Sequence, residues 1–196
     1  MSQSPHSRLP AFDEHGTLLV VIDTPKGSRN KFAFDDELGV FMLGGVLPAG
    51  AVFPFDFGYV PRTRAGDGDP VDVLVLMDEP AFVGCVVPAR LIWVIEAEQT
   101  EAGETTRNDR LLAVAKSSRN HRDVRTVNDL HGNLVDEIEH FFVSYNESKG
   151  KEFRVLKRGG ARRAETVLKG AMRAMPAPRP AVSPPRRPPA PSPPAR

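Results

Sequence analysis

The chain has 196 residues, 40% of them hydrophobic, with 26 basic and 25 acidic side chains and a single cysteine, Cys85. This length suits one domain with a substantial core, and one cysteine excludes a disulfide framework. The net charge of +1 indicates no basic face of the kind that binds nucleic acid, so we expect no nucleic-acid partner.

The N-terminus has no basic start followed by an apolar core, which a secretory signal would need. No apolar run approaches the roughly 18 residues that span a bilayer. Cysteine and histidine do not recur at the spacing of a zinc site. We therefore expect a cytoplasmic protein without a membrane partner.

From residue 17 to about residue 115, short β segments alternate with turn-forming proline, glycine and aspartate. These segments are rich in branched and aromatic residues, which favour strands. The predicted strands are residues 18–22, 31–34, 40–43, 71–77, 83–87, 91–97 and 111–115. Several short strands at this spacing indicate a barrel or a sandwich.

After residue 133 the apolar spacing changes to that of a helix. Apolar side chains from Leu134 to Tyr145 fall on one helical stripe. Asn133 is a suitable N-cap and Gly150 a suitable stop, so we predict a helix between them. A second helix is predicted over residues 161–172. The predicted fold is thus mainly β with C-terminal helices.

The composition divides the chain into three parts: an N-terminal extension (1–16), a folded domain (17–173) and a tail (174–196). The tail holds ten of the 19 prolines, four arginines and no acid. Such a segment cannot pack a core, so we predict a disordered, partly polyproline-II tail. Without the tail, 22 basic and 25 acidic residues remain, so the domain is acidic.

The most informative segment is an acidic turn that leads directly into a predicted strand, Asp67-Gly68-Asp69-Pro70-Val71-Asp72. Three carboxylates in six residues repel one another unless a cation or several donors lies among them. Clustered hard oxygen ligands suit Mg²⁺ or Mn²⁺. The same residues are also typical of a solvated turn. A calcium loop of the EF-hand type is excluded, because the third acid stands at position six and a strand follows.

The segments around this turn complete a recognisable pattern, namely residues 22–32, 53–61, 123–130, 140–145 and 149–151. In this order and spacing the chain resembles the soluble, Mg²⁺-dependent inorganic pyrophosphatases of family I, from residue 18 to residue 172. The resemblance implies a five-stranded OB-like β-barrel flanked by two α-helices, and a homo-oligomer, usually a hexamer. It also implies hydrolysis of pyrophosphate to two phosphates with Mg²⁺, or possible use of Mn²⁺, as the cofactor.

The resemblance also implies roles for individual residues. Asp67 and Asp72 match aspartates that bind the metal ions flanking the attacking water, and Asp69 matches the carboxylate that accepts its proton. Lys31 and Tyr145 match residues that hold a phosphate of the substrate. The expected catalytic centre is therefore the acidic turn, with substrate bound against Lys31 and Tyr145.

The chain departs from the family pattern at several positions. Asp23 replaces a glutamate that supports the metal site and remains a candidate metal-site acid. Thr100 and Asn108 align with two metal-binding aspartates, with Asp109 as the adjacent candidate ligand, and Arg110 aligns with a lysine and is expected to bind substrate. Five further positions lose a charge or a hydroxyl group: Ala33, Gly45, Phe53, Phe57 and Asn146.

These losses leave three functional hypotheses open. The first is a divergent pyrophosphatase with reduced activity, since each lost charged contact to a transition state typically costs about 10²–10³ in rate. The second is a catalytically weak or inactive homologue that binds a phosphate-containing ligand or a protein partner. The third is action on a larger phosphoanhydride or phosphoester, because the pair Gly44-Gly45 would open the pocket.

Overall fold

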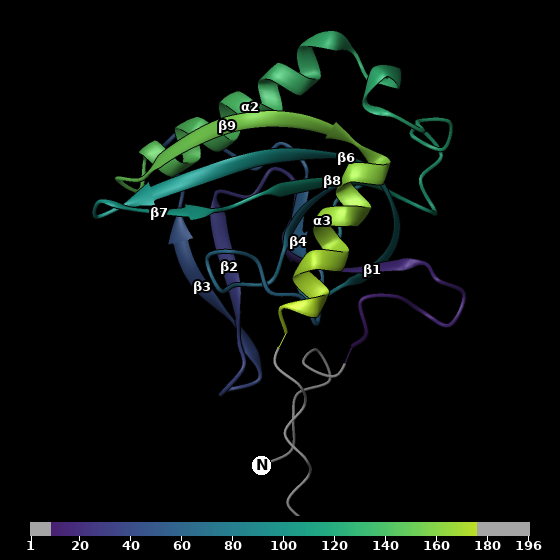
Figure 1. The fold of residues 1–196 in the computed structure, drawn as a ribbon, viewed down its shortest axis with the longest axis horizontal. Helices are drawn as coiled ribbons and strands as arrows, with labels where there is room; N and C mark the ends of the chain where they lie inside the picture. The colour runs from purple at the N-terminus through teal and green to yellow at the C-terminus, as the bar shows by residue number, and fades with distance from the viewer. Residues whose placement is uncertain (1–8, 176–196) are drawn as a thin grey trace, which may run out of the picture.

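A closed barrel of five strands forms the centre of the computed structural model, which describes residues 9–175 (Figure 1). Its strands, in spatial order, are β1 (Leu18–Thr24), β4 (Asp56–Tyr59), β5 (Asp72–Leu76), β8 (Arg110–Ala115) and β6 (Val86–Glu101). The ring closes because β1 pairs with both β4 and β6. Strands β5 and β8 run parallel, and the other neighbours are antiparallel. The predicted five-stranded barrel is confirmed.

Four further strands lie outside the barrel. The far half of β6 pairs with β7 (Glu104–Arg107) and with β9 (Glu152–Gly160). Strands β2 (Asn30–Asp35) and β3 (Val40–Val46) form a separate antiparallel hairpin. This hairpin lies beside the barrel in Figure 1. A short 3₁₀ helix, η1 (Val127–Asp129), precedes the first α-helix.

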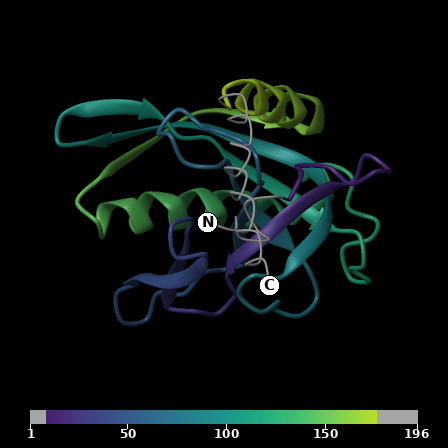
Figure 2. The same cartoon turned by 90° about the horizontal axis from the view of Figure 1, so that it is seen from below.

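Two helices, α2 (Gly132–Glu147) and α3 (Ala161–Arg173), lie on opposite sides of the sheet (Figure 2). The strands explain this arrangement, because successive side chains of a strand point to opposite faces. In β5, Val73 and Val75 belong to the hydrophobic cluster that α3 joins, whereas Leu74 and Leu76 belong to the cluster that α2 joins. Each helix therefore covers one of two apolar faces made by the same strands.

Several predicted elements need correction. Residues 83–85 lie before β6, and the remainder of the strands predicted at 83–87 and 91–97 belongs to that one continuous strand, which has a register shift between Leu91 and Trp93. Strands β4, β7 and β9 were not predicted, since they are short or largely exposed. The predicted cap of the first helix is wrong as well, because α2 starts at Gly132 with His131 as its N-cap.

The structure describes part of the predicted N-terminal extension and only the first two residues of the predicted tail. Ala11, within the predicted extension, is buried, and Phe12 forms a β-bridge with Leu18. That part of the extension thus packs on the barrel. Residues 176–196 lie outside the described residues, so the disordered tail stays a prediction. Within residues 9–175, no helix is both long enough and apolar enough to cross a membrane.

An ion cluster ties β6, β7 and α3 together on the side of the sheet covered by α3. The carboxylate of Glu96 accepts hydrogen bonds from Arg163 Nε and Nη2 at 2.9 and 2.7 Å, and from Arg107 Nη2 at 2.5 Å. The Glu96 side chain is only 6% exposed. Hydrogen bonding to Arg163, supported by Arg107, lowers the pKa of Glu96 to about 2.

This cluster predicts a loss of stability in acid. The pKa of Glu96 in the folded protein lies below the value of about 4.3 for an unfolded chain, so its stabilising contribution is complete above that value and is lost as the pH falls towards 2. Urea titrations should show the free energy of unfolding falling between about pH 5 and pH 2, and falling less in a Glu96→Gln variant. Glu79→Gln, an exposed site, should keep the wild-type pH dependence. Identical pH dependence in wild type and Glu96→Gln would contradict this role.

Candidate functional site

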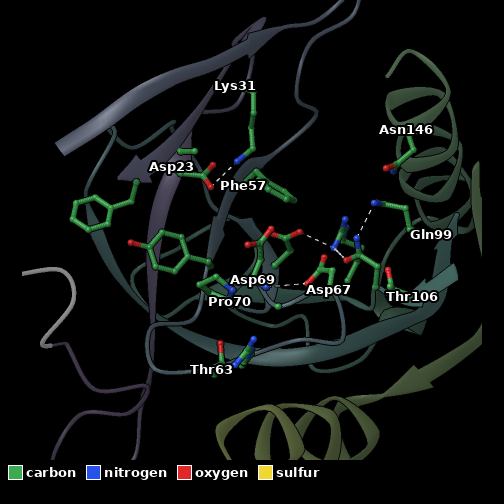
Figure 3. Close-up of a pocket in the computed structure, with 18 of the residues that line it drawn as sticks. Asp23, Lys31, Phe57, Thr63, Asp67, Asp69, Pro70, Gln99, Thr106 and Asn146 are labelled. Atoms are coloured by element: carbon green, nitrogen blue, oxygen red, sulfur yellow. Dashed lines mark hydrogen bonds and ion pairs between the residues drawn. The ribbon is translucent and has the colours of Figure 1, made fainter. Parts of the chain in front are cut away.

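A cavity of about 980 Å³ opens between the β2–β3 hairpin, the acidic turn, the β6–β7 hairpin and the C-terminal end of α2 (Figure 3). It collects segments that are far apart in the sequence. All but one of the predicted site residues line it, namely Asp23, Lys31, Asp67, Asp69, Asp72, Arg110 and Tyr145. The exception is Asp109.

The acidic turn is held rigidly between β4 and β5. The buried Thr63 donates its hydroxyl hydrogen bond to the carbonyl of Val60 at 2.6 Å and accepts one from the amide of Val71 at 2.9 Å. Gly68 has a φ of +94°, a left-handed conformation that favours glycine. The Asp69 amide donates to Asp67 Oδ1 at 3.2 Å. These contacts shape the turn and orient the carboxylate of Asp67, which lies near Asp69 at the cavity wall (Figure 3).

The turn carboxylates repel one another. Burial raises the pKa of Asp67, and repulsion from Asp72 and Asp69 raises it further, while Arg110 acts in the opposite direction. Neither Asp67 nor Asp69 forms an ion pair among the residues that the structure describes. An added cation beside them would relieve this repulsion.

A buried ion pair lies on the opposite wall. Lys31 Nζ is 2.6 Å from Asp23 Oδ2, and these side chains are 16% and 7% exposed. Burial raises the pKa of Asp23 to about 6, although the charge of Lys31 and its hydrogen bond lower it. Asp23 Oδ1 is buried without a hydrogen-bond partner in the described chain. Lys31 also lies over the Phe57 ring, 4.5 Å from its centroid.

A second buried ion pair joins β8 to β5. Arg110 Nη1 lies 2.6 Å from Asp72 Oδ2, and the Arg110 side chain is only 6% exposed. The same nitrogen donates a hydrogen bond to Asn108 Oδ1. The guanidinium stacks near two rings, at 5.4 Å from the centroid of Phe142 and 5.6 Å from that of Phe153. The neighbouring amide of Asn108 in turn donates to Gln99 Oε1 at 2.9 Å.

Aromatic side chains pack around the part of the cavity wall that the C-terminal end of α2 forms. The Tyr145 ring contacts the Phe53 ring edge to face, with 5.5 Å between the ring centroids. It stacks on the Phe141 ring, with 5.8 Å between the centroids. Lys149 donates a hydrogen bond to the Tyr145 hydroxyl and lies 4.1 Å from its ring centroid. Burial, followed by repulsion from Lys31 and Lys151, lowers the pKa of Lys149. Burial is also the main cause of the raised pKa of Tyr145.

The structure does not bring Asp109 into the cavity. Its Oδ1 accepts hydrogen bonds from the amide of Ala97 at 3.0 Å and from Arg107 Nε at 2.7 Å, and it lines a separate cavity of about 320 Å³. The reason is the alternation of side chains in extended backbone. Asn108 and Arg110 point to the main cavity, so the residue between them points away.

Two basic residues are among the cavity residues that were missed in the sequence. Arg62 and Arg64 flank the buried Thr63, and both line the cavity. Arg62 has a φ of +54°, unusual for a residue other than glycine. Neither side chain has an ion-pair partner within residues 9–175. The signal that could have found them was a pair of basic residues shortly before the acidic turn.

Comparisons with known proteins agree with this architecture. The family model described as inorganic pyrophosphatase matches residues 20–176. An inorganic pyrophosphatase from Synechocystis is 39% identical over 150 residues, covering 76% of this chain and 86% of the relative. The structure of the Thermus thermophilus inorganic pyrophosphatase matches with a TM-score of 0.78 at 29% identity, covering 87% of this chain and 98% of that one. The chain therefore belongs to the inorganic pyrophosphatase family.

Proposed function

We propose that the protein hydrolyses inorganic pyrophosphate to two phosphates in the main cavity, with Mg²⁺ or Mn²⁺, at a lower rate than relatives with a complete set of charged groups. One observation carries this proposal. The acidic turn places Asp67, Asp69 and Asp72 in the same cavity as the phosphate-binding candidates Lys31 and Tyr145.

The donor set of this cavity fits a divalent cation. Within residues 9–175 no three acidic, histidine or cysteine side chains already surround one point. Mg²⁺ does not need such a cage, because it usually binds one or two carboxylates together with water and substrate phosphates. Asp67 and Asp72 would hold it, and the unpartnered oxygen of Asp23 offers further negative charge. Bound divalent ions would neutralise phosphate charge and lower the pKa of an attacking water.

The side chains would act mainly by positioning the substrate. Phosphoryl transfer depends on alignment and on neutralising charge spread over the phosphate oxygens. Lys31, Arg110 and the Tyr145–Lys149 pair present donors to the cavity from three directions. Asp69, which lies beside Asp67 without an ion pair in the described chain, would accept the proton of the attacking water.

Reduced activity is supported by what surrounds these groups. Gln99 and Asn108 are neutral and their amides bond to each other, so the acids of this part of the wall are confined to Glu101 and Glu104 at the tip of the β6–β7 hairpin. The amide of Asn146 is turned back to the carbonyl of Phe142 at 2.8 Å. Gly45 stands opposite Lys31 in the β2–β3 hairpin and adds no cation. Each missing charged contact would cost about 10²–10³ in rate, with strong non-additivity.

Phosphate release by the purified full chain tests this proposal. With pyrophosphate and Mg²⁺ or Mn²⁺, release should exceed the uncatalysed background, and a chelator should abolish it. Metal and pyrophosphate together should also raise the Tm of the protein, because a ligand that binds only the folded state stabilises it. That shift without phosphate release would favour the alternative, a binding homologue. Selective release from tripolyphosphate would favour the larger substrate.

We also propose that the chain forms a homo-oligomer, with the hexamer implied by its family resemblance. The β2–β3 hairpin exposes large apolar side chains, namely Leu38, Val40, Met42, Leu43 and Val46. Exposed apolar patches often mark protein interfaces. These residues support the proposal, and light scattering measures the mass directly.

A further inference from the structure

We propose that Arg110 is a built-in cation that fills an oxygen-lined cation site beside the acidic turn, so that the wild-type protein binds one divalent ion fewer than the same site would hold without it. The link of this cation to catalysis rests on the proposed function. The occupation of the site by Arg110 does not, because it can be measured by metal binding alone.

Oxygen atoms from β5 and from the two residues before β8 converge on one nitrogen of Arg110. Nη1 contacts Asp72 Oδ2 at 2.6 Å and Asn108 Oδ1, and lies 3.4 Å from the backbone oxygen of Asp109. A carboxylate, an amide carbonyl and a peptide carbonyl are ligands of the type that hard divalent cations use. The guanidinium nitrogen therefore occupies the point where such a cation would bind.

The pairing of strands fixes this arrangement. Asp72 and Arg110 are register partners in the parallel pair β5–β8, so their backbone positions are set by the sheet. The guanidinium is buried and stacked near the Phe142 and Phe153 rings. The cation is thus well positioned.

The single negative charge of the oxygen atoms around Nη1 also matches the single positive charge of the guanidinium. Asp72 is the only carboxylate among the side-chain oxygens described around Nη1, because Asn108 is neutral and is itself bonded to Gln99. A divalent ion at the Nη1 position in addition to the guanidinium would meet a like charge, and the described contacts of Nη1 include no second carboxylate to compensate it. Asp67 lies outside this pair and remains available to a metal ion.

The guanidinium keeps donors for a ligand. Arg110 Nε is buried and has no hydrogen-bond partner in the described structure, and Arg110 lines the main cavity. An unpaired buried donor is unfavourable, and a phosphate oxygen is a strong acceptor for guanidinium groups. Arg110 can therefore take the place of a metal ion at Asp72 Oδ2 and also contact a phosphate, while the other Asp72 oxygen and the Asp67 carboxylate stay available to the metal ion of the proposed function.

Counting bound Mn²⁺ without substrate tests the proposal. Calorimetric titration and electron paramagnetic resonance should show that Arg110→Gln binds one more Mn²⁺ ion per chain than wild type does. Arg110→Met, whose apolar stem keeps the packing on both phenylalanine rings, should show the same gain. Arg110→Gln combined with Asn108→Asp should bind the added ion at least tenfold more tightly than Arg110→Gln alone.

Arg107→Gln provides the matched control. Arg107 pairs with Glu96 and Asp109 and does not line the main cavity, so its removal should leave the Mn²⁺ count at the wild-type value. The proposal is overturned if folded Arg110→Gln and Arg110→Met proteins bind the same number of Mn²⁺ ions as wild type, or fewer. Because no turnover is measured, an inactive wild-type protein would sink the proposed function and leave this test intact.

Discussion

An Asp72→Asn variant should release phosphate from pyrophosphate at least about 10²-fold more slowly than wild type. Asp72 stands where the acidic turn enters β5 and is the ion-pair partner of Arg110. The amide keeps the shape of the carboxylate but removes its charge, and with it a ligand of the proposed metal ion. It also leaves the guanidinium of Arg110 buried without a carboxylate, which is strongly unfavourable.

Folding must be separated from catalysis in this comparison. Glu79→Gln changes an exposed acid outside the cavity and should keep wild-type turnover. Circular dichroism and thermal unfolding should show that Asp72→Asn is folded under assay conditions. A folded Asp72→Asn protein with turnover close to that of wild type would remove the acidic turn from the proposed mechanism.

The largest expected effect on stability comes from Gly58→Ala. Gly58 lies in β4, against β1, and a Cβ built there would stand 2.1 Å from the carbonyl oxygen of Val21. The neighbouring atoms are backbone atoms of a strand in a closed barrel, so they cannot turn aside as a side chain would. We expect the free energy of unfolding, measured by urea titration, to fall by about 3 kcal/mol.

A second glycine in a strand serves as the control. A Cβ built on Gly45 in β3 would meet no atom within 4 Å, and this glycine has no positive φ. Gly45→Ala should therefore change the free energy of unfolding by less than about 1 kcal/mol. Equal losses in the two variants would show that the close approach of β1 and β4 does not limit residue 58.

Two of the predicted strands, β5 and β8, have both faces covered. In β5 and β8 nearly every side chain is buried between α2 on one side and the cluster joined by α3 on the other, which produces continuous apolar runs. Strand β9 has only Phe153 buried, so its sequence lacks such a run. Its position depends on pairing with β6, a tertiary contact that local patterns do not encode.

The candidate site was predictable to a similar extent. The acidic turn, Lys31 and Tyr145 were identified from a local motif and a family resemblance, and all of them line one cavity. The orientation of Asp109 could have been inferred by extending the predicted strand backwards by one residue, to Arg110. The pairing of Arg110 with Asp72 could not, because it requires knowing that β5 and β8 are parallel neighbours.

Phosphorus NMR of pyrophosphate incubated with the full chain and Mg²⁺ tests the central claim most directly. We predict that the pyrophosphate signal is converted to that of phosphate by wild type, and that conversion stops when the metal is chelated. A pyrophosphate signal that persists with folded wild-type protein, while Mg²⁺ and pyrophosphate together raise its Tm, would contradict catalysis and leave a protein that only binds this ligand.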